Sequence, residues 1–243
     1  MKPESVEVKV TISTQVDQAV SALGLGSGKR WEILFCEDVT AAVTPSTPLL
    51  ELGVILRARR KSASKGDSTI KLRPCRWSQL APGFAENAEA DGAELKIEAD
   101  WAGPRRSLAA SMTADWDDGR FDRVRAGELP PAALFSKRQE SFLAGCGGGR
   151  VNLGVVTALR PFEAVRWDAF PATVGQVELS VRAERWTLPA ERDFLELSIV
   201  SDVASAAGAQ AALESFTASR GLPVDPTPEN KTRRVLELLV AAP

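Results

Sequence analysis

Apolar and polar residues alternate in short segments of the first half of the chain. In residues 6–11 every second residue is a valine and the others are charged or polar, which is the period of a strand with one apolar face. Similar segments predict strands at residues 54–60, 69–73 and 94–101 and in part of 107–114, and residues 31–39 are also predicted to form a strand. Because a polar loop containing Gly66 separates residues 54–60 from residues 69–73, these two segments are expected to form a hairpin.

The second half repeats the strand pattern and adds helices. Strands are predicted at residues 151–159, 163–167, 175–186 and 194–200, and helices at residues 14–23, 204–220 and 230–241, with a helical or mixed segment at 128–143. The first helix follows a capping-box sequence at Thr14, and the last follows Thr227 and Pro228, which suit an N-cap and a first helical position. Because strands follow one another with few helices between them, we expect an α+β fold with an antiparallel sheet or barrel and packed helices.

The length and the glycine content bear on domain organisation. A chain of 243 residues suits one large domain or two small ones, and 44% apolar with 26% charged residues is ordinary for a globular protein. The glycine-rich residues 145–149 are a natural connector. We therefore predict a single domain over residues 1–243, with two halves joined near residues 144–150.

The composition narrows the possible chemistry, because the chain has no histidine. A Ser-His-Asp triad is excluded, as are zinc or copper sites built on imidazole. With 30 basic and 32 acidic residues the net charge is -2, so no nucleic-acid partner is expected. The cysteines Cys36, Cys75 and Cys146 form no CxxC pair and are expected to be reduced thiols. No signal-peptide pattern and no apolar run of the ~20 residues that span a membrane is found, so we expect a cytoplasmic protein without membrane contact.

Each predicted strand carries its charges on one face and its apolar residues on the other. The charged faces hold Glu7 and Lys9; Arg57 and Arg59; Lys71 and Arg73; Glu94, Lys96, Glu98 and Asp100; Glu178, Arg182 and Glu184; and Glu196. In an open sheet these faces would simply be solvated. If the sheet closes into a barrel, the charges point inward, and buried charges require partners. A polyanion held by Arg and Lys and Mg²⁺ or Mn²⁺ held by carboxylates would supply them.

Several short motifs occur in an order that resembles a known family. They are Glu7-Val8-Lys9, the LRAR segment at 56–59, the TIKLR segment at 69–73, Ser136-Lys137-Arg138, Leu195-Glu196-Leu197 and Asn230-Lys231. Together they resemble the CYTH family of triphosphate tunnel enzymes, which includes inorganic triphosphatase, thiamine triphosphatase and class IV adenylyl cyclase. The resemblance covers most of the chain, and the LRxR strand followed by the TxKxR strand is its most specific part.

The resemblance implies an eight-stranded antiparallel tunnel that binds a triphosphate. By position, the implied phosphate ligands are Lys9, Arg57, Arg59, Lys71, Arg73 and Arg138. The implied metal ligands for Mg²⁺ or Mn²⁺ are Glu7 and Glu196, with Glu98 and Glu178 as further candidates. Either Glu7 or Glu196 would position or deprotonate the attacking water.

Two departures from the family pattern affect the acidic residues. Ser5 stands where the family has the first Glu of its opening motif, and Phe194 and Ser198 flank Glu196 where the family has paired acids. The basic residues are thus complete while the acidic residues are fewer. The first hypothesis is a metal-dependent hydrolase of tripolyphosphate, a nucleoside triphosphate or thiamine triphosphate. The alternatives are a polyphosphate- or nucleotide-binding module without turnover, an adenylyl cyclase-like enzyme, and a protein-interaction domain.

Overall fold

The computed structural model describes residues 3–39, 46–147, 149, 151–188, 192–226 and 231–241. The strands are β1 Val6–Ile12, β2 Lys29–Glu37, β3 Val54–Arg60, β4 Gly66–Cys75, β5 Ala88–Ala90, β6 Ala93–Ala102, β7 Arg105–Trp116, β8 Thr157–Ala158, β9 Phe162–Val174, β10 Val177–Thr187 and β11 Phe194–Ser201. The helices are α1 Val16–Ala22, α2 Pro48–Glu51, α3 Arg120–Arg125, α4 Lys137–Cys146, α5 Ala206–Ser219 and α6 Lys231–Ala241. The predicted α+β class is confirmed.

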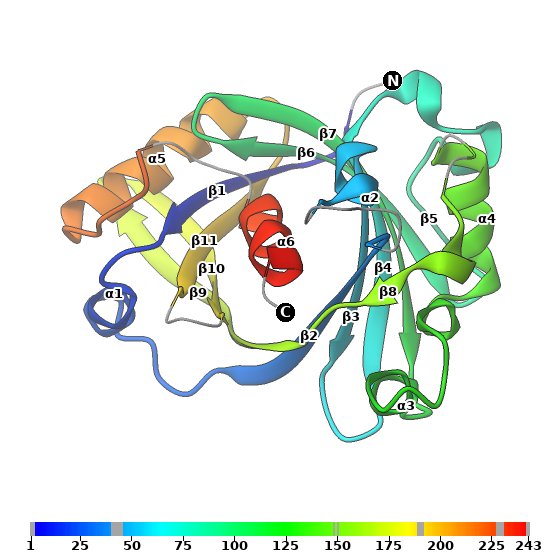
Figure 1. The fold of residues 1–243 in the computed structure, drawn as a ribbon. Helices are drawn as coiled ribbons and strands as arrows, with labels where there is room; N and C mark the ends of the chain where they lie inside the picture. Colours follow the sequence, from blue (N-terminus) through cyan, green and yellow to red (C-terminus); the bar gives the residue numbers. More distant parts are fainter. Residues whose placement is uncertain are drawn as a thin grey trace.

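Nine of the described strands form a closed ring. Their order is β1, β11, β10, β9, β2, β3, β4, β7 and β6, and all of these neighbours pair antiparallel. Strand β6 then pairs parallel with β1 and closes the ring (Figure 1). The predicted antiparallel sheet is therefore confirmed, but the ring has nine strands and one parallel pair where the resemblance implies eight antiparallel strands.

Helices cover the outer, apolar face of the ring. On one side Ile70 of β4 belongs to a core with Phe121 of α3 and Phe142 of α4. On the other side Val8 of β1 belongs to a core with Leu213 of α5. Because successive residues of a strand point to opposite faces, the charged residues that alternate with these apolar ones point into the ring. The inward-facing arrangement, and not the solvated open sheet, is the one that the structure adopts.

Helix α6 lies within the outline of the ring (Figure 1). Its residues Val235, Leu236 and Leu239 form a core with Phe35 of β2 and Phe194 of β11, both of which are buried. The helix therefore packs against the apolar part of the ring interior. The polar part of the interior is left as a cavity, which is described below.

Three local expectations differ from the structure. Residues 151–159 contain a short 3-10 helix at Leu153–Val155 and the two-residue strand β8. The Asn152 side chain accepts a hydrogen bond from the backbone N–H of Gly154 at 2.9 Å, and such local bonds compete with strand pairing. The Thr14 capping box does not form: α1 begins after Gln15, which has φ 52°. Strand β4 begins at Gly66, inside the expected loop.

Two further expectations fall partly or wholly outside the described residues. The connector at 145–149 includes residue 148, and the N-cap pair Thr227 and Pro228 precedes α6; none of these three is described. Within the described ranges, no helix has the length and apolar content needed to cross a membrane.

Candidate functional site

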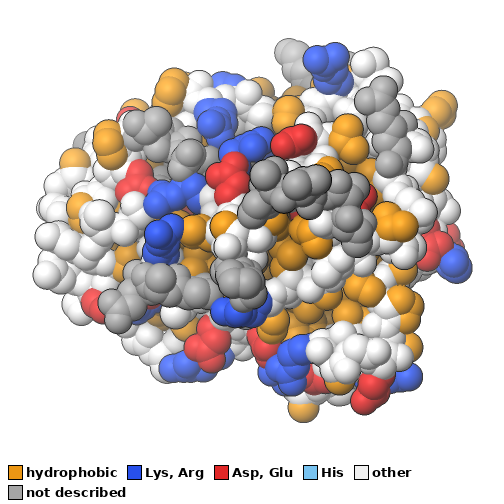
Figure 2. All heavy atoms as spheres, viewed as in Figure 1, with side chains coloured by type: hydrophobic (Ala, Val, Ile, Leu, Met, Phe, Trp, Pro, Cys, Tyr) orange, Lys and Arg blue, Asp and Glu red, His pale blue; other side chains and the backbone are white. Residues whose placement is uncertain are grey.

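The ring encloses a cavity of about 690 Å³, which we call the lumen. Among the described residues, twelve Lys or Arg side chains and six Asp or Glu side chains line it. The basic residues are Lys9, Arg57, Arg59, Lys71, Arg73, Lys96, Arg105, Arg106, Arg166, Arg182, Lys231 and Arg233, and the acidic residues are Glu7, Glu51, Glu98, Asp100, Glu184 and Glu196. Lys and Arg side chains gather on the face between α5 and α6 (Figure 2). Since the whole chain has a charge of -2, the lumen concentrates a positive charge that the rest of the molecule offsets.

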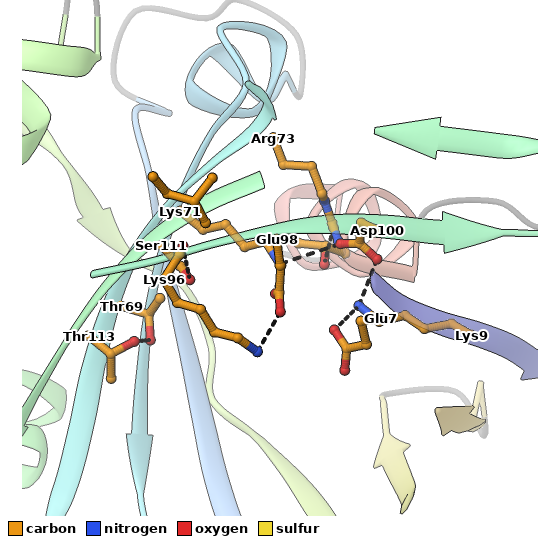
Figure 3. A network of polar contacts seen from close by, with 12 residues as sticks. Glu7, Lys9, Thr69, Lys71, Arg73, Lys96, Glu98, Asp100, Ser111 and Thr113 are labelled. Atoms are coloured by element: carbon orange, nitrogen blue, oxygen red, sulfur yellow. Dashed lines mark hydrogen bonds and ion pairs between the residues drawn. The ribbon is translucent and has the colours of Figure 1, made fainter. Parts of the chain in front are cut away.

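Asp100 of β6 is the centre of the first group of charges in the lumen (Figure 3). Its Oδ1 lies 2.9 Å from Lys9 Nζ, and its Oδ2 lies 2.9 Å from an Arg73 guanidinium nitrogen and 3.4 Å from Lys71 Nζ. Burial by itself would raise the pKa of Asp100, but Lys9, Lys71 and Arg73 outweigh burial and hold this pKa well below its usual range. Asp100 is therefore ionised and neutralises part of the basic cluster.

Two glutamates extend this group. Glu7 lies opposite Asp100 in the β1–β6 register, and its Oε2 is 2.8 Å from Lys9 Nζ. Glu98 is 3.6 Å from Lys71 Nζ and 2.5 Å from Lys96 Nζ. Each of these carboxylates thus contacts at least one ammonium group.

The second group of charges lies where β10 and β11 meet α6. Glu184 and Glu196 are directly opposite in the β10–β11 register. Lys231 of α6 places its Nζ 3.0 Å from Glu196 Oε1 and 3.9 Å from the centre of the Trp186 ring. Trp186 Nε1 donates a hydrogen bond to Glu184. Burial would raise the pKa of Glu184, but Lys231, this hydrogen bond and Arg57 together lower it.

The two arginines of β3 have different environments. Arg59 donates two hydrogen bonds of 2.8 Å to Asp67, and Asp67 also pairs with Lys61 at 2.7 Å, so the Arg59 guanidinium is fixed and compensated. Arg57 donates to Thr69 Oγ1 at 3.3 Å, and within the described ranges no carboxylate lies within ion-pair distance of it. The buried Nε of Arg57 has no hydrogen-bond partner among the described residues. Burial, and then the charge of Arg59, lowers the pKa of Arg57 to about 10, although the charges of Asp67 and Glu184 act in the opposite direction. Arg57 therefore stays charged at neutral pH without a direct ion pair among the described residues.

Most of the residues implied by the family resemblance meet in the lumen. These are Lys9, Arg57, Arg59, Lys71 and Arg73 among the basic residues, and Glu7, Glu98 and Glu196 among the acidic residues. Ser198 also lines the lumen, while Phe194 is part of the core with α6.

Two implied ligands do not join the others. Arg138 lies on α4, which packs on the outside of β4 and β7, and its guanidinium is 4.7 Å from the centre of the Phe84 ring. Glu178 is exposed, because β10 pairs with β11 only from Arg182 onward and Glu178 pairs only with Thr173 of β9. The structure therefore separates both residues from the proposed phosphate and metal ligands.

Several lumen residues were missed by the sequence reasoning. Asp100 and Glu184 lie on charged strand faces that period-two alternation identifies, so this signal could have assigned them a role. Arg166 lies in β9, with its guanidinium 5.1 Å from the centre of the Trp31 ring. It belongs to none of the motifs named above, so no sequence signal identified it. Lys231 belongs to the Asn230-Lys231 motif of the family resemblance, but only the packing of α6 shows that its ammonium group reaches the lumen.

The carboxylates of the lumen do not fit a divalent-cation site. Mg²⁺ and Mn²⁺ prefer several oxygen ligands around one point. Among the described residues, no three carboxyl or thiol groups converge in this way. Instead, Glu7, Asp100 and Glu196 each contact an ammonium group at 2.8–3.0 Å. We therefore derive no chemical step through a metal ion.

The ion pair of Glu7 predicts a loss of stability in acid. Burial would raise the pKa of Glu7, but Lys9 and then Lys71 outweigh it and lower the pKa from 4.5 to about 2. Above pH 4.5 Glu7 is ionised in both the folded and unfolded states, so its stabilisation is complete; it is lost as the pH falls from 4.5 to 2. We expect Glu7 to contribute roughly 3 kcal/mol to this loss.

Urea unfolding at a series of pH values measures this effect. The Glu7→Gln variant is expected to show a shallower fall in the free energy of unfolding over the same pH range. An unchanged pH dependence in the variant would show that Glu7 is not the group responsible.

Comparisons with known proteins give distant matches only. No family model matches the chain, and no curated protein matches its sequence. Among solved structures, the fold is similar to a candidate adenylate cyclase from Vibrio parahaemolyticus, with 11% identity over 97% of this chain and 99% of that one and a TM-score of 0.45. It is also similar to a conserved hypothetical protein from Pyrococcus furiosus (13% identity, 91% and 96% coverage, TM-score 0.42) and to a Pyrococcus horikoshii protein (11%, 96% and 98%, TM-score 0.44). At these identities and TM-scores the matches carry no functional information, so we argue the function from the residues of this chain.

Proposed function

We propose that this protein binds a small molecule carrying a triphosphate or a similar polyphosphate group in its lumen. The observation that supports the proposal most directly is Arg57, a charged guanidinium inside the ring whose buried Nε has no partner among the described residues. A buried donor of a charged group without a hydrogen-bond partner is costly. A phosphate oxygen is the natural partner of such a group, because a guanidinium can donate two parallel hydrogen bonds to it.

The surroundings of Arg57 favour a polyanion over a single anion. Arg73 and Lys71 come from the adjacent strand β4 and Arg166 comes from β9, and all three line the same lumen as Arg57. Basic groups spread over several strands match a chain of phosphates better than one phosphate. The lumen volume of about 690 Å³ lies within the usual range of small-molecule sites and is compatible with tripolyphosphate, a nucleoside triphosphate or thiamine triphosphate.

Hydrolysis of the bound phosphoanhydride is the second candidate function. Glu7 and Glu196 both reach the lumen, where either could orient a water molecule. However, an effective general base has a pKa near the working pH, and the pKa of Glu7 is about 2. Glu196 is engaged by Lys231. For these reasons we propose binding as the function, and a phosphate-release assay tests the second candidate, hydrolysis, directly.

Titration calorimetry with tripolyphosphate tests the proposal, with inorganic phosphate at equal ionic strength as the matched control ligand. We expect saturable binding of tripolyphosphate and much weaker binding of monophosphate. At about 100 times its Kd, tripolyphosphate should stabilise the fold by about 2.7 kcal/mol, which a thermal melt will show. Absence of tripolyphosphate binding by a folded sample would refute the proposal. Release of phosphate from tripolyphosphate, a nucleoside triphosphate or thiamine triphosphate in the presence of Mg²⁺ or Mn²⁺ would establish the hydrolase instead of the binding module.

A further inference from the structure

The register of the ring places carboxylates side by side at two points in the lumen. Glu7 of β1 lies beside Asp100 of β6, and Glu184 of β10 lies opposite Glu196 of β11. Residues paired in this way on adjacent strands are roughly 5 Å apart. Like charges at this separation repel, so each pair requires a cation. Paired carboxylates facing a cavity are also the usual place for a divalent cation.

A lysine ammonium group occupies the first of these places. Lys9 Nζ lies 2.8 Å from Glu7 Oε2 and 2.9 Å from Asp100 Oδ1, and Figure 3 shows it between the two carboxylates. The Lys9 side chain is only 12% exposed. Burial would lower the pKa of Lys9, but Asp100 and Glu7 outweigh burial and raise it well above its usual value. Lys9 therefore remains a cation at this position.

A second lysine occupies the other place, and it comes from a different part of the fold. Lys231 lies at the start of α6, and its ammonium group pairs with Glu196 at 3.0 Å. The same ammonium group is the main charge that keeps Glu184 ionised, and it lies over the Trp186 ring. The Lys231 side chain is 8% exposed, so the cation is held by packing as well as by charge.

We propose that Lys9 and Lys231 are built-in counter-cations of the lumen, so that polyanion binding requires no divalent metal ion. This inference rests on the proposed polyanion site and specifies how that site is neutralised. Each ammonium group offsets one of the two negative charges of its carboxylate pair, which leaves Arg57 and the other basic side chains to bind the phosphates. Mg²⁺ in solution then acts only on the free ligand, where it reduces the negative charge that the lumen recognises.

The first experiment compares tripolyphosphate binding in EDTA with binding in excess Mg²⁺, by titration calorimetry on the full chain. We expect binding in EDTA, with an affinity equal to or higher than that in Mg²⁺. Binding that occurs only in Mg²⁺ would overturn the inference and leave the proposed polyanion site standing. Absence of binding in both conditions would refute the proposed function, and the inference that rests on it.

The second experiment measures Mn²⁺ binding by the loss of the electron paramagnetic resonance signal of free Mn²⁺, without any polyanion. The unmodified protein is expected to take up no Mn²⁺. Lys231→Met keeps the apolar stem but removes the cation that pairs with Glu196 and acts on Glu184, and it is expected to take up Mn²⁺; adding Glu196→Gln should abolish this uptake. The matched control is Arg233→Met on the same helix, which also lines the lumen but pairs with Glu237 and should take up none.

Two outcomes of the Mn²⁺ experiment would overturn the inference. One is stoichiometric uptake of Mn²⁺ by the unmodified protein. The other is a folded Lys231→Met variant that takes up no more Mn²⁺ than the Arg233→Met control. If Lys231→Met does not fold, the EDTA comparison on the unmodified chain still decides the inference.

Discussion

Replacing Arg57 by alanine is expected to weaken tripolyphosphate binding by roughly tenfold to a hundredfold, the range for losing a hydrogen-bonded contact to a charged group. The same change is expected to leave the free protein at least as stable as before. Arg57 has one long side-chain hydrogen bond, of 3.3 Å to Thr69, and its buried Nε has no partner among the described residues. Removing this guanidinium relieves a desolvation cost, which offsets the loss of its longer-range attraction to Asp67 and Glu184.

This combination of lower affinity and unchanged or higher stability distinguishes a ligand-binding arginine from a structural one. Calorimetric Kd values and thermal melts of the free protein measure the two effects separately. Arg138→Ala is the matched control, because Arg138 lies on the outer helix α4 over Phe84 and its removal should not change the Kd. The Kd of Arg57→Lys should lie between the Kd of the unmodified protein and that of Arg57→Ala. Lysine keeps the positive charge but cannot form the bidentate hydrogen bonds of a guanidinium. A stable Arg57→Ala protein with unaltered affinity would contradict the proposed site.

Replacing Asp100 by asparagine is expected to cost about 3–5 kcal/mol of stability, the usual effect of removing one partner from a buried ion pair. Asp100 is buried and compensates Lys9, Arg73 and Lys71 at 2.9, 2.9 and 3.4 Å. For a domain of this size the Tm should fall by roughly 6–20 °C. Urea unfolding and a thermal melt measure this loss.

A polyanion is expected to restore part of this stability. With Asp100 neutral, three lumen cations lose a carboxylate that competes with the ligand, so tripolyphosphate should raise the Tm of Asp100→Asn by more than it raises that of the unmodified protein. Glu163→Gln is the control for charge removal alone, since Glu163 pairs with Arg30 at 3.6 Å on the surface with both side chains more than half exposed. Its loss should cost less than about 1 kcal/mol. An Asp100→Asn protein that gains no additional stability from tripolyphosphate would show that these cations do not contact the ligand.

The sequence predicted the chemistry of the lumen more fully than its geometry. Alternation along β3, β4 and β6 correctly placed Arg57, Lys71 and Asp100 on charged faces opposite apolar ones, because the two-residue period of a strand is a local property. The absence of histidine likewise excluded whole classes of site from composition alone. Arg138 matches a family motif but lies on the outer helix α4, because a short sequence match cannot distinguish the inner from the outer side of a ring.

The sequence by itself determined which side chains share a face of each strand and that these faces carry charges of both signs. Only the tertiary structure decided that nine strands close into a ring, that Glu7 lies beside Asp100 and Glu184 opposite Glu196, and that Lys231 enters the lumen from α6. Ring closure joins β1 to β6 and β11, segments roughly 90 and 190 residues away. Strand register depends on burying every apolar face of the ring at once, and the position of α6 depends on its packing against the apolar interior. No short stretch of sequence contains either kind of information.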